Sequence, residues 1–207
     1  MPTPFPPEFF RRFDEADDAE FYGEPRLVTH IDDATIAALT QLYREVLAPG
    51  GTVLDLMSSW VSHLPPEVSF ARVAGLGMNR TELEHNPRLT DFAVHDLNTT
   101  PELPYPDATF DAVLNAVSIQ YLTRPVEVYA SVRRVLKPNG LAVIATSHRC
   151  FPNKAIMAWH TSSPDQRARL LQLYLERATG FGPATCLDRS PPAADPLWVI
   201  LASRIDP

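Results

Sequence analysis

Glycine is scarce in this sequence, with 8 residues among 207, whereas proline contributes 21. Average usage is roughly 7% glycine, and turns that bring the backbone close to a ligand commonly depend on it. The stretch Thr52–Pro65, TVLDLMSSWVSHLP, shows the consequence. An apolar strand ends in an acid there, as in nucleotide-binding folds, but no glycine follows. A glycine-rich ligand loop of the usual kind is therefore excluded after this strand.

Cysteine is almost absent. Cys150 and Cys186 are the two thiols and lie far apart in the chain. This pattern indicates free thiols in a reducing compartment and no disulfide framework. His148 and His160 flank Cys150 without the spacing of zinc ligands, so no metal site is predicted.

Long apolar runs and basic clusters are also missing. No segment is long and apolar enough to span a bilayer, and the N-terminus lacks the pattern of a secretion signal. The formal net charge is −7 and the pI about 5.3. We therefore expect a cytoplasmic protein that binds neither membranes nor, as a main partner, nucleic acid. Hydrophobic residues make up 45% of the chain, enough for the core of a single domain.

Apolar stretches of strand length alternate with stretches of helical periodicity, which predicts an α/β protein. Such alternation is typical of a mostly parallel sheet with helices on both faces, whose ligands bind beyond the carboxyl ends of the strands. The predicted strands are 52–56, 69–76, 90–94, 110–117, 141–146 and 198–203; the predicted helices are 33–47, 81–85, 126–136 and 163–178, with a turn at 137–140.

The segment after residue 103 carries several spaced motifs in a fixed order. LPYPDATFDAV is followed by RRVLKPNG, so that Phe110 and Asp111 precede the run Arg134–Gly140. This arrangement resembles the class I S-adenosylmethionine-dependent methyltransferases that act on small molecules, over roughly residues 48–146. The resemblance implies a Rossmann-like fold with a mostly parallel seven-stranded sheet. It also implies one domain over 1–207, with an N-terminal lid or arm at 1–31, a cofactor-binding core at 32–147, and acceptor-side elements at 148–207.

Several cofactor-binding positions match the family pattern. Asp55 matches the acid at the end of the first strand. The run His95-Asp96-Leu97 matches the turn that meets the adenine, and Asn115-Ala116 matches the segment beside the methionine arm. The resemblance therefore implies S-adenosylmethionine as cofactor.

Two other cofactor positions depart from the pattern. Met57, Ser59 and Val61 occupy the positions of the family's glycines, so Met57, Ser58 and Ser59 are expected to line a rewired loop. Gly77 stands where the family has the acid that accepts both ribose hydroxyls. We expect Asn79 to supply one amide oxygen instead, and Met78 to pack on the adenine.

The acceptor side is less defined by sequence. Tyr121 and His148 are the candidate catalytic residues, since they follow the fourth and fifth predicted strands. Further candidates for substrate binding are Gln120, Arg149 and the trio Tyr22, Arg26 and His30, whose four-residue spacing would align them on a helix.

Simpler interpretations accompany these assignments. Ser58, Ser59 and Ser62 lie outside any GxSxG motif, so loop capping is favoured over a nucleophile, and His63 is treated as part of that loop. His95 fits packing better than catalysis. Four acids at 14, 15, 17 and 18 are expected to form a solvated face.

The sequence therefore favours a methyltransferase that acts on a small molecule. One alternative is a catalytically inactive module of the same fold that binds or regulates. Another is an enzyme of this fold with a different nucleoside ligand or reaction, because fold alone does not determine chemistry.

Overall fold

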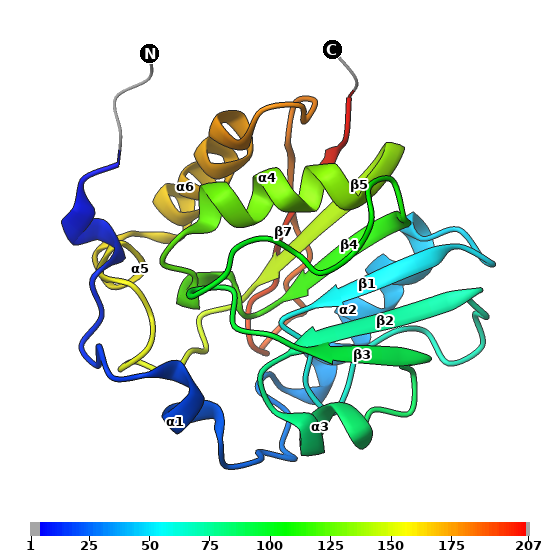
Figure 1. Cartoon of the computed structure of the whole chain (residues 1–207), viewed down its shortest axis with the longest axis horizontal. Helices are drawn as coiled ribbons and strands as arrows, with labels where there is room; N and C mark the ends of the chain where they lie inside the picture. The colour runs from blue at the N-terminus through cyan, green and yellow to red at the C-terminus, as the bar shows by residue number, and fades with distance from the viewer. Residues whose placement is uncertain (1–4, 206–207) are drawn as a thin grey trace.

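The computed structural model describes residues 5–205 as an α/β fold around one seven-stranded sheet (Figure 1). The strand order is β3-β2-β1-β4-β5-β7-β6. All pairings are parallel except those of β7 with β5 and with β6. The predicted Rossmann-like sheet is confirmed. The strands are β1 Thr52–Leu56, β2 Arg72–Gly77, β3 Asp91–Val94, β4 Phe110–Ala116, β5 Leu136–Thr146, β6 Thr185–Asp188 and β7 Trp198–Ser203.

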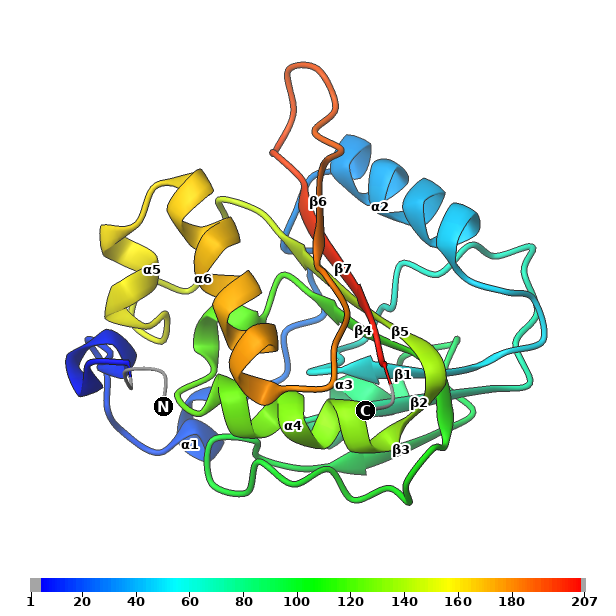
Figure 2. The ribbon, with the colours of Figure 1, turned by 90° about the horizontal axis from the view of Figure 1, so that it is seen from above.

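Helices cover both faces of this sheet, as predicted. Figure 2 shows α2 on one side and α4 and α6 on the other. The longer helices begin at clear caps: the Asp32 side chain accepts the N–H of Thr35, and Ser163 forms a capping box with Gln166. The helices are α1 Asp18–Tyr22, α2 Asp33–Val46, α3 Arg80–Glu84, α4 Pro125–Val135, α5 Met157–Thr161 and α6 Pro164–Ala178, with 3₁₀ turns η1 Pro7–Phe10 and η2 Ile119–Tyr121.

Alternation along the strands divides the core into two layers. Val53 of β1 packs with Leu39 and Tyr43 of α2. Its neighbour Leu54 packs on the opposite face with Val128 of α4. Successive strand residues point to opposite faces, so each β-strand contributes to both layers. Burial on both faces leaves the carboxyl ends of the parallel strands as the edge at which loops can build a site.

Two segments differ from the sequence-based expectation. The predicted turn at 137–140 lies within β5, where the register with β4 shifts between Phe110 and Ala112 and Asn139 adopts φ 62°. No helix was predicted for residues 57–71, which follow β1, and they contain none. Strand β6 was not predicted, because it is four residues long and mostly exposed, so burial leaves little pattern in its sequence.

The arm, described over residues 5–31, crosses the carboxyl edge of the sheet with little regular structure. Its only α-helix among the described residues is α1, which ends at Tyr22. The helical alignment predicted for Tyr22, Arg26 and His30 is therefore wrong. Pro25 lies between the first two of these residues, and it disfavours the helical conformation at Glu24. Residues 1–4 of the predicted arm lie outside the described part of the chain.

Candidate functional site

A cavity of about 140 Å³ lies at the carboxyl ends of β1, β2 and β4, under the arm. Its lining combines the loop after β1, the start of α3, the turn after β3 and the end of β4. Most of the predicted site residues are brought together here: Tyr22, Arg26, His30, Asp55, Met57, Ser58, Ser59, Gly77, Met78, Asn79, His95, Asp96, Leu97, Ala116 and Tyr121.

Serine hydroxyls organise the loop after β1. Ser58 Oγ and Ser62 Oγ each donate to Asp55 Oδ2 at 2.6 Å. Asn86 Nδ2 donates to Ser62 Oγ and to the carbonyl of Ser59, both at 2.9 Å. We call Asp55, Ser58, Ser62 and Asn86 the turn cluster. These hydroxyl and amide groups hold a loop that contains no glycine, with Met57 carrying the positive φ of 59°.

Asp55 carries the charge of the turn cluster in a dry environment. The residue is 4% exposed. Burial raises the pKa of its carboxyl to about 6, although the two serine hydroxyls act in the opposite direction. Hydroxyl donors lower a carboxyl pKa, but they supply no positive charge to offset the loss of water.

The loop after β1 also closes the end of β2. Ser58 N donates to the carbonyl of Leu76 at 2.8 Å. A Cβ atom at Gly77 would lie 2.2 Å from the carbonyl oxygen of Ser58, far inside van der Waals contact. Glycine at position 77 is therefore required by close backbone approach, and no side chain fits there without moving the loop.

Asn79 has a structural task at the start of α3. Its Oδ1 accepts the N–H of Glu82 at 3.1 Å, which is an N-cap bond. Its Nδ2 donates at 2.9 Å to the carbonyls of Tyr22 and Gly23 in the arm. The amide oxygen expected to serve a ribose hydroxyl thus already accepts one bond, from the helix.

Glu82 lines the cavity beside Asn79, and sequence reasoning missed it. Its Oε2 accepts the hydroxyl of Ser59 at 2.7 Å, and its Oε1 accepts the N–H of Arg26 at 2.7 Å. One carboxylate thus joins the loop after β1, helix α3 and the arm. A carboxylate in the first turn of a helix is a common stabilising feature, so nothing in the sequence singled this one out.

The turn after β3 closes on itself. Asp96 Oδ1 accepts the N–H of Asn98 at 2.8 Å, and Oδ2 accepts the hydroxyl of Thr99 at 2.6 Å. His95 Nε2 lies 2.7 Å from the carbonyl of Thr100. These bonds fix the backbone of Asp96 and Leu97, and both residues line the cavity.

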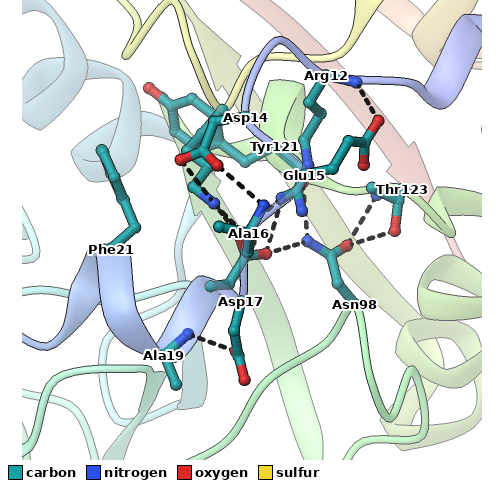
Figure 3. Close-up of polar contacts among 12 residues, drawn as sticks. Arg12, Asp14, Glu15, Ala16, Asp17, Ala19, Phe21, Asn98, Tyr121 and Thr123 are labelled. Atoms are coloured by element: carbon teal, nitrogen blue, oxygen red, sulfur yellow. Dashed lines mark hydrogen bonds and ion pairs between the residues drawn. The ribbon is translucent and has the colours of Figure 1, made fainter.

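A cluster of charges fastens the arm to the body of the protein (Figure 3). Arg12 Nη1 lies 2.8 Å from both oxygens of Asp18, and Lys154 Nζ lies 3.1 Å from Asp18 Oδ1 and 3.1 Å from Asp14 Oδ2. Asn98 Nδ2 also donates to Asp18 at 2.8 Å. We call Arg12, Asp14, Asp18, Asn98 and Lys154 the arm cluster.

The expectation of a solvated acidic face is wrong for Asp18. It is 5% exposed, and the Lys154 side chain is wholly buried. Burial by itself raises the pKa of Asp18, but the hydrogen bonds from Arg12 and Asn98 outweigh it and hold the pKa below its usual range. Arg12 precedes Asp18 by six residues, outside the three- and four-residue spacing of helical ion pairs, and Lys154 lies far along the chain. The sequence therefore gave no sign of these ion pairs.

Aromatic rings form the wall of the cavity opposite the turn cluster. The rings of Tyr121 and Phe151 stack with centroids 5.7 Å apart. Tyr22 and His30 approach Phe151 edge-on, at 6.5 and 5.2 Å. The guanidinium of Arg26 lies 5.4 Å from the centre of the Phe151 ring. Together they make an apolar surface with polar edges, and Phe151 is a member that sequence reasoning missed.

Tyr121 is held in place by its own hydroxyl. Its Oη accepts the N–H of Phe151 at 2.8 Å. Burial raises the pKa of Tyr121 to about 12, so the phenol stays protonated at neutral pH. The residue can position a ligand, but it is a poor proton acceptor.

Two of the histidines that line the cavity, His30 and His63, have a lowered pKa. Burial lowers the pKa of His30, and it lowers that of His63 to about 4. Both rings are therefore neutral at pH 7. His63 Nδ1 is buried and has no hydrogen-bond partner within residues 5–205. The residue was assigned to the loop, and its place in the cavity follows from the absence of a helix after β1.

Four predicted residues lie elsewhere. His148 Nε2 is 3.3 Å from Asp195 Oδ1, and Arg149 Nε is 3.0 Å from both oxygens of the same carboxylate. Asp195 also pairs with Asp32, the cap of α2, through backbone N–H groups in both directions. The structure thus places His148 and Arg149 at a junction between the segment after β5, the loop before β7 and α2.

The other two are buried beneath the cavity. Asn115 Oδ1 accepts the hydroxyl of Ser118, which lines the cavity, while its Nδ2 is buried without a partner in the described structure. Gln120 is 1% exposed and donates to the carbonyl of Val117 at 2.9 Å. Neither lines the cavity surface.

Two further absences concern the described part of the chain alone. Residues 5–205 contain no group of three or more His, Cys, Asp or Glu side chains that could hold a metal ion. No helix among them has the length and apolar character needed to cross a membrane.

Comparison with known proteins supports the family resemblance. A family model described as a methyltransferase domain matches residues 62–144. The resemblance to class I S-adenosylmethionine-dependent methyltransferases is thereby confirmed. Among curated proteins, the search found no match to this chain.

Solved structures of similar fold are numerous. The 4+2 cyclase SpnF superposes with a TM-score of 0.65 at 17% identity, covering 91% of this chain and 92% of that one. A methyltransferase from Mesorhizobium loti gives 0.58 at 16% identity, with coverages of 81% and 98%. The 1,6-didemethyltoxoflavin-N1-methyltransferase from Burkholderia thailandensis, with bound S-adenosylhomocysteine, gives 0.61 at 17% identity, with coverages of 84% and 80%. At these identities the likeness establishes the fold.

Proposed function

We propose that this chain is an S-adenosylmethionine-dependent methyltransferase that acts on a small molecule. One observation carries the proposal: the cavity lies at the carboxyl ends of β1, β2 and β4 and gathers most of the motif residues that the resemblance assigns to the cofactor. In open parallel sheets this edge is where ligands bind.

The cavity residues fit a cationic nucleoside. Four carboxylates line it, from Asp18, Asp55, Glu82 and Asp96, against one guanidinium, from Arg26. Met57, Met78 and Leu97 add apolar surface beside the strand ends. Asp55 with the loop after β1 would hold the methionine portion, and Met78 with the turn at Asp96 and Leu97 would hold the base. When bound, the cofactor supplies an electrophilic methyl group on a sulfonium.

The remaining lining supports a small acceptor. Tyr22, Tyr121 and Phe151 would hold a planar or apolar molecule between the arm and the sheet edge. No domain is inserted between the strands of the described chain to take a macromolecule. Positioning and the exclusion of water would provide most of the rate enhancement.

Proton transfer is needed only for an oxygen or nitrogen acceptor that carries a proton. His30 and His63 have a lowered pKa in the cavity and are candidates to accept one there. We assign no step to His148, because its ring faces Asp195.

The test is a calorimetric titration with S-adenosylmethionine and S-adenosylhomocysteine. We expect micromolar binding by the native protein. Ala116→Phe should abolish it by filling the cavity, and the control Ala71→Phe should not, because Ala71 is exposed at the opposite edge of the sheet. No binding at millimolar concentrations by folded native protein would overturn the proposal.

A second candidate function is ligand binding without methyl transfer. The observation that favours it is the closed end of β2, where the ribose acceptor of the family is sterically excluded. The two candidates separate in a transfer assay that measures S-adenosylhomocysteine release in the presence of a panel of small acceptors. Binding without release across the panel favours the module.

A further inference from the structure

The end of β2 cannot supply the usual contact to a ribose. In the family resemblance, an acid at position 77 accepts both ribose hydroxyls, but here a Cβ atom at Gly77 would lie 2.2 Å from Ser58 O. The blocking atom belongs to the backbone, which is held in place because Ser58 N donates to the carbonyl of Leu76, the residue before Gly77 on β2. A nucleoside in this cavity must therefore find its diol acceptor on another element.

The carboxylates that line the cavity differ in how many further hydrogen bonds they can accept. Asp18 is engaged by Arg12, Lys154 and Asn98. Asp96 already accepts two backbone N–H groups and one hydroxyl within its own turn. Asp55 receives two hydroxyls on Oδ2 and is only 4% exposed, so it offers little accessible carboxylate to a ligand.

Glu82 has unused hydrogen-bond acceptor positions and lies next to the end of β2. Each of its oxygens accepts one bond, from Ser59 Oγ and from Arg26 N. A carboxylate has about four acceptor positions, so roughly one remains on each oxygen. Two acceptors side by side match the two O–H donors of a vicinal diol.

The position of Glu82 is tied to the closed strand end. The next residue, Leu83, has its Cδ2 atom 3.3 Å from the Cβ position of Gly77, so this turn of α3 packs directly on the end of β2. Ser59, which donates to Glu82, follows the residue whose carbonyl blocks Gly77. Glu82 is half-buried and lines the cavity with Gly77 and Met78.

We propose that Glu82 is the acceptor for the two ribose hydroxyls of a nucleoside ligand, taking the place of the acid that is missing at position 77. This inference rests on the proposed function, since it requires a nucleoside in the cavity. It also gives the arm a part in recognition, because Arg26 N shares the same carboxylate. Glu82 is thus a specificity-determining residue that selects ribose over deoxyribose.

The experiment compares S-adenosylhomocysteine with its 2′-deoxy counterpart by calorimetry. The native protein should bind the ribose form at least about tenfold more tightly, as expected for a hydrogen bond to a charged acceptor. In Glu82→Gln this preference should fall toward unity. Glu84→Gln is the matched control, since Glu84 is exposed on the same helix and pairs with Arg80; it should keep the native preference.

A purely structural role for Glu82 would give a different result. It would weaken both ligands equally and leave their ratio unchanged, and that outcome would overturn the inference while leaving the proposed function intact. If Glu82→Gln fails to fold, Glu82→Asp provides the same test, because the shorter side chain keeps the charge but withdraws both oxygens. Absence of S-adenosylhomocysteine binding by folded native protein would overturn the proposed function and this inference together.

Discussion

Asp18 and Asp55 line the same cavity and are equally buried, at 5% and 4% exposure, yet their carboxyl groups respond in opposite ways. The pKa of Asp18 is lowered and that of Asp55 is raised to about 6. Asp55 lies deeper in the protein than Asp18, and the partners of the two residues also differ. The arm cluster surrounds Asp18 with two cations and an amide, whereas the turn cluster gives Asp55 two hydroxyls.

The comparison shows how one cavity combines two kinds of support. Positive charge offsets the cost of burying a carboxylate, while neutral donors offset it only in part. The arm cluster therefore holds a segment from the N-terminal end of the chain as a fixed cover. The turn cluster instead holds the Asp55 carboxyl, whose pKa is about 6, at the start of the loop that replaces a glycine turn.

The largest expected effect comes from removing a cation of the arm cluster. Lys154→Met leaves Asp18 and Asp14 without this partner inside the protein. We expect the free energy of unfolding to fall by about 3–5 kcal/mol, as for other broken buried ion pairs. Urea denaturation measures it. The control Lys137→Met removes a partly exposed pair with Asp111 and should cost about 1 kcal/mol or less. Equal small losses in both variants would contradict the prediction.

Asp55 and Asp18 should make the free energy of unfolding depend on pH in opposite directions. Because the pKa of Asp55 is about 6 in the folded state and ordinarily 3.8, the folded protein holds a proton that the unfolded chain releases. Its contribution to stability is therefore present below about pH 4 and lost as the pH rises through 6. Asp18, with a lowered pKa, contributes stability above its ordinary range and loses it as the pH falls.

The measurement is urea denaturation of the native protein, of Asp55→Asn and of Asp18→Asn, between about pH 3.5 and about pH 7.5. Relative to Asp55→Asn, the native protein should lose about 3 kcal/mol between pH 4 and pH 7, from the shift of the pKa to about 6. Relative to Asp18→Asn, it should gain stability as the pH rises. Parallel curves for all three proteins would show that the two environments do not differ.

The steric closure of β2 gives the next effect. Gly77→Ala forces a Cβ atom against Ser58 O, and the loop of the turn cluster must shift. We expect a loss of about 1–3 kcal/mol in the free energy of unfolding, typical of overpacking. Gly182→Ala is the control, because an added Cβ there approaches nothing closer than 3.4 Å. An unchanged free energy of unfolding in Gly77→Ala would contradict the prediction and would mean that the loop after β1 moves aside at little cost.

The smallest effect concerns one hydroxyl of the turn cluster. Ser62→Ala removes a donor to Asp55 and leaves Asn86 Nδ2 with the carbonyl of Ser59. We expect a loss of about 1–2 kcal/mol, together with a further rise in the pKa of Asp55 measured by carboxyl NMR. Thr161→Ala removes an exposed hydroxyl and should cost no more than about 0.5 kcal/mol. An unchanged Asp55 pKa in Ser62→Ala would contradict the assigned role of the hydroxyl.

Most of the sheet and its ligand edge could be predicted from sequence. Strands β1 and β7 have the predicted limits, and helices α2 and α6 begin within about one residue of their predicted starts. These features depend on local periodicity and on side chains that bond within three residues. The short strand β6 and the bulge in β5 depend on partners far along the chain, so the local pattern did not contain them.

The candidate site divides in the same way. The motif positions Asp55, Gly77 and Asp96 were found because they align with the family pattern at the ends of predicted strands. Glu82, Phe151 and His63 were missed because each reaches the cavity only through an irregular loop or through a pairing with the arm. His148 was placed at the sheet edge by its position after β5, but Asp195, 47 residues later in sequence, turns it away.

The sequence by itself determined the order of strands and helices, the edge where a ligand binds, and the loss of the family's glycines and ribose acid, because these are properties of periodicity and residue identity at known positions. Only the tertiary structure decided how the losses are compensated. It folded the irregular loop after β1 so that Ser58 and Ser62 meet one oxygen of Asp55. It also set Glu82 against Ser59 and buried Lys154 against the arm, and these contacts join segments that are far apart in the chain.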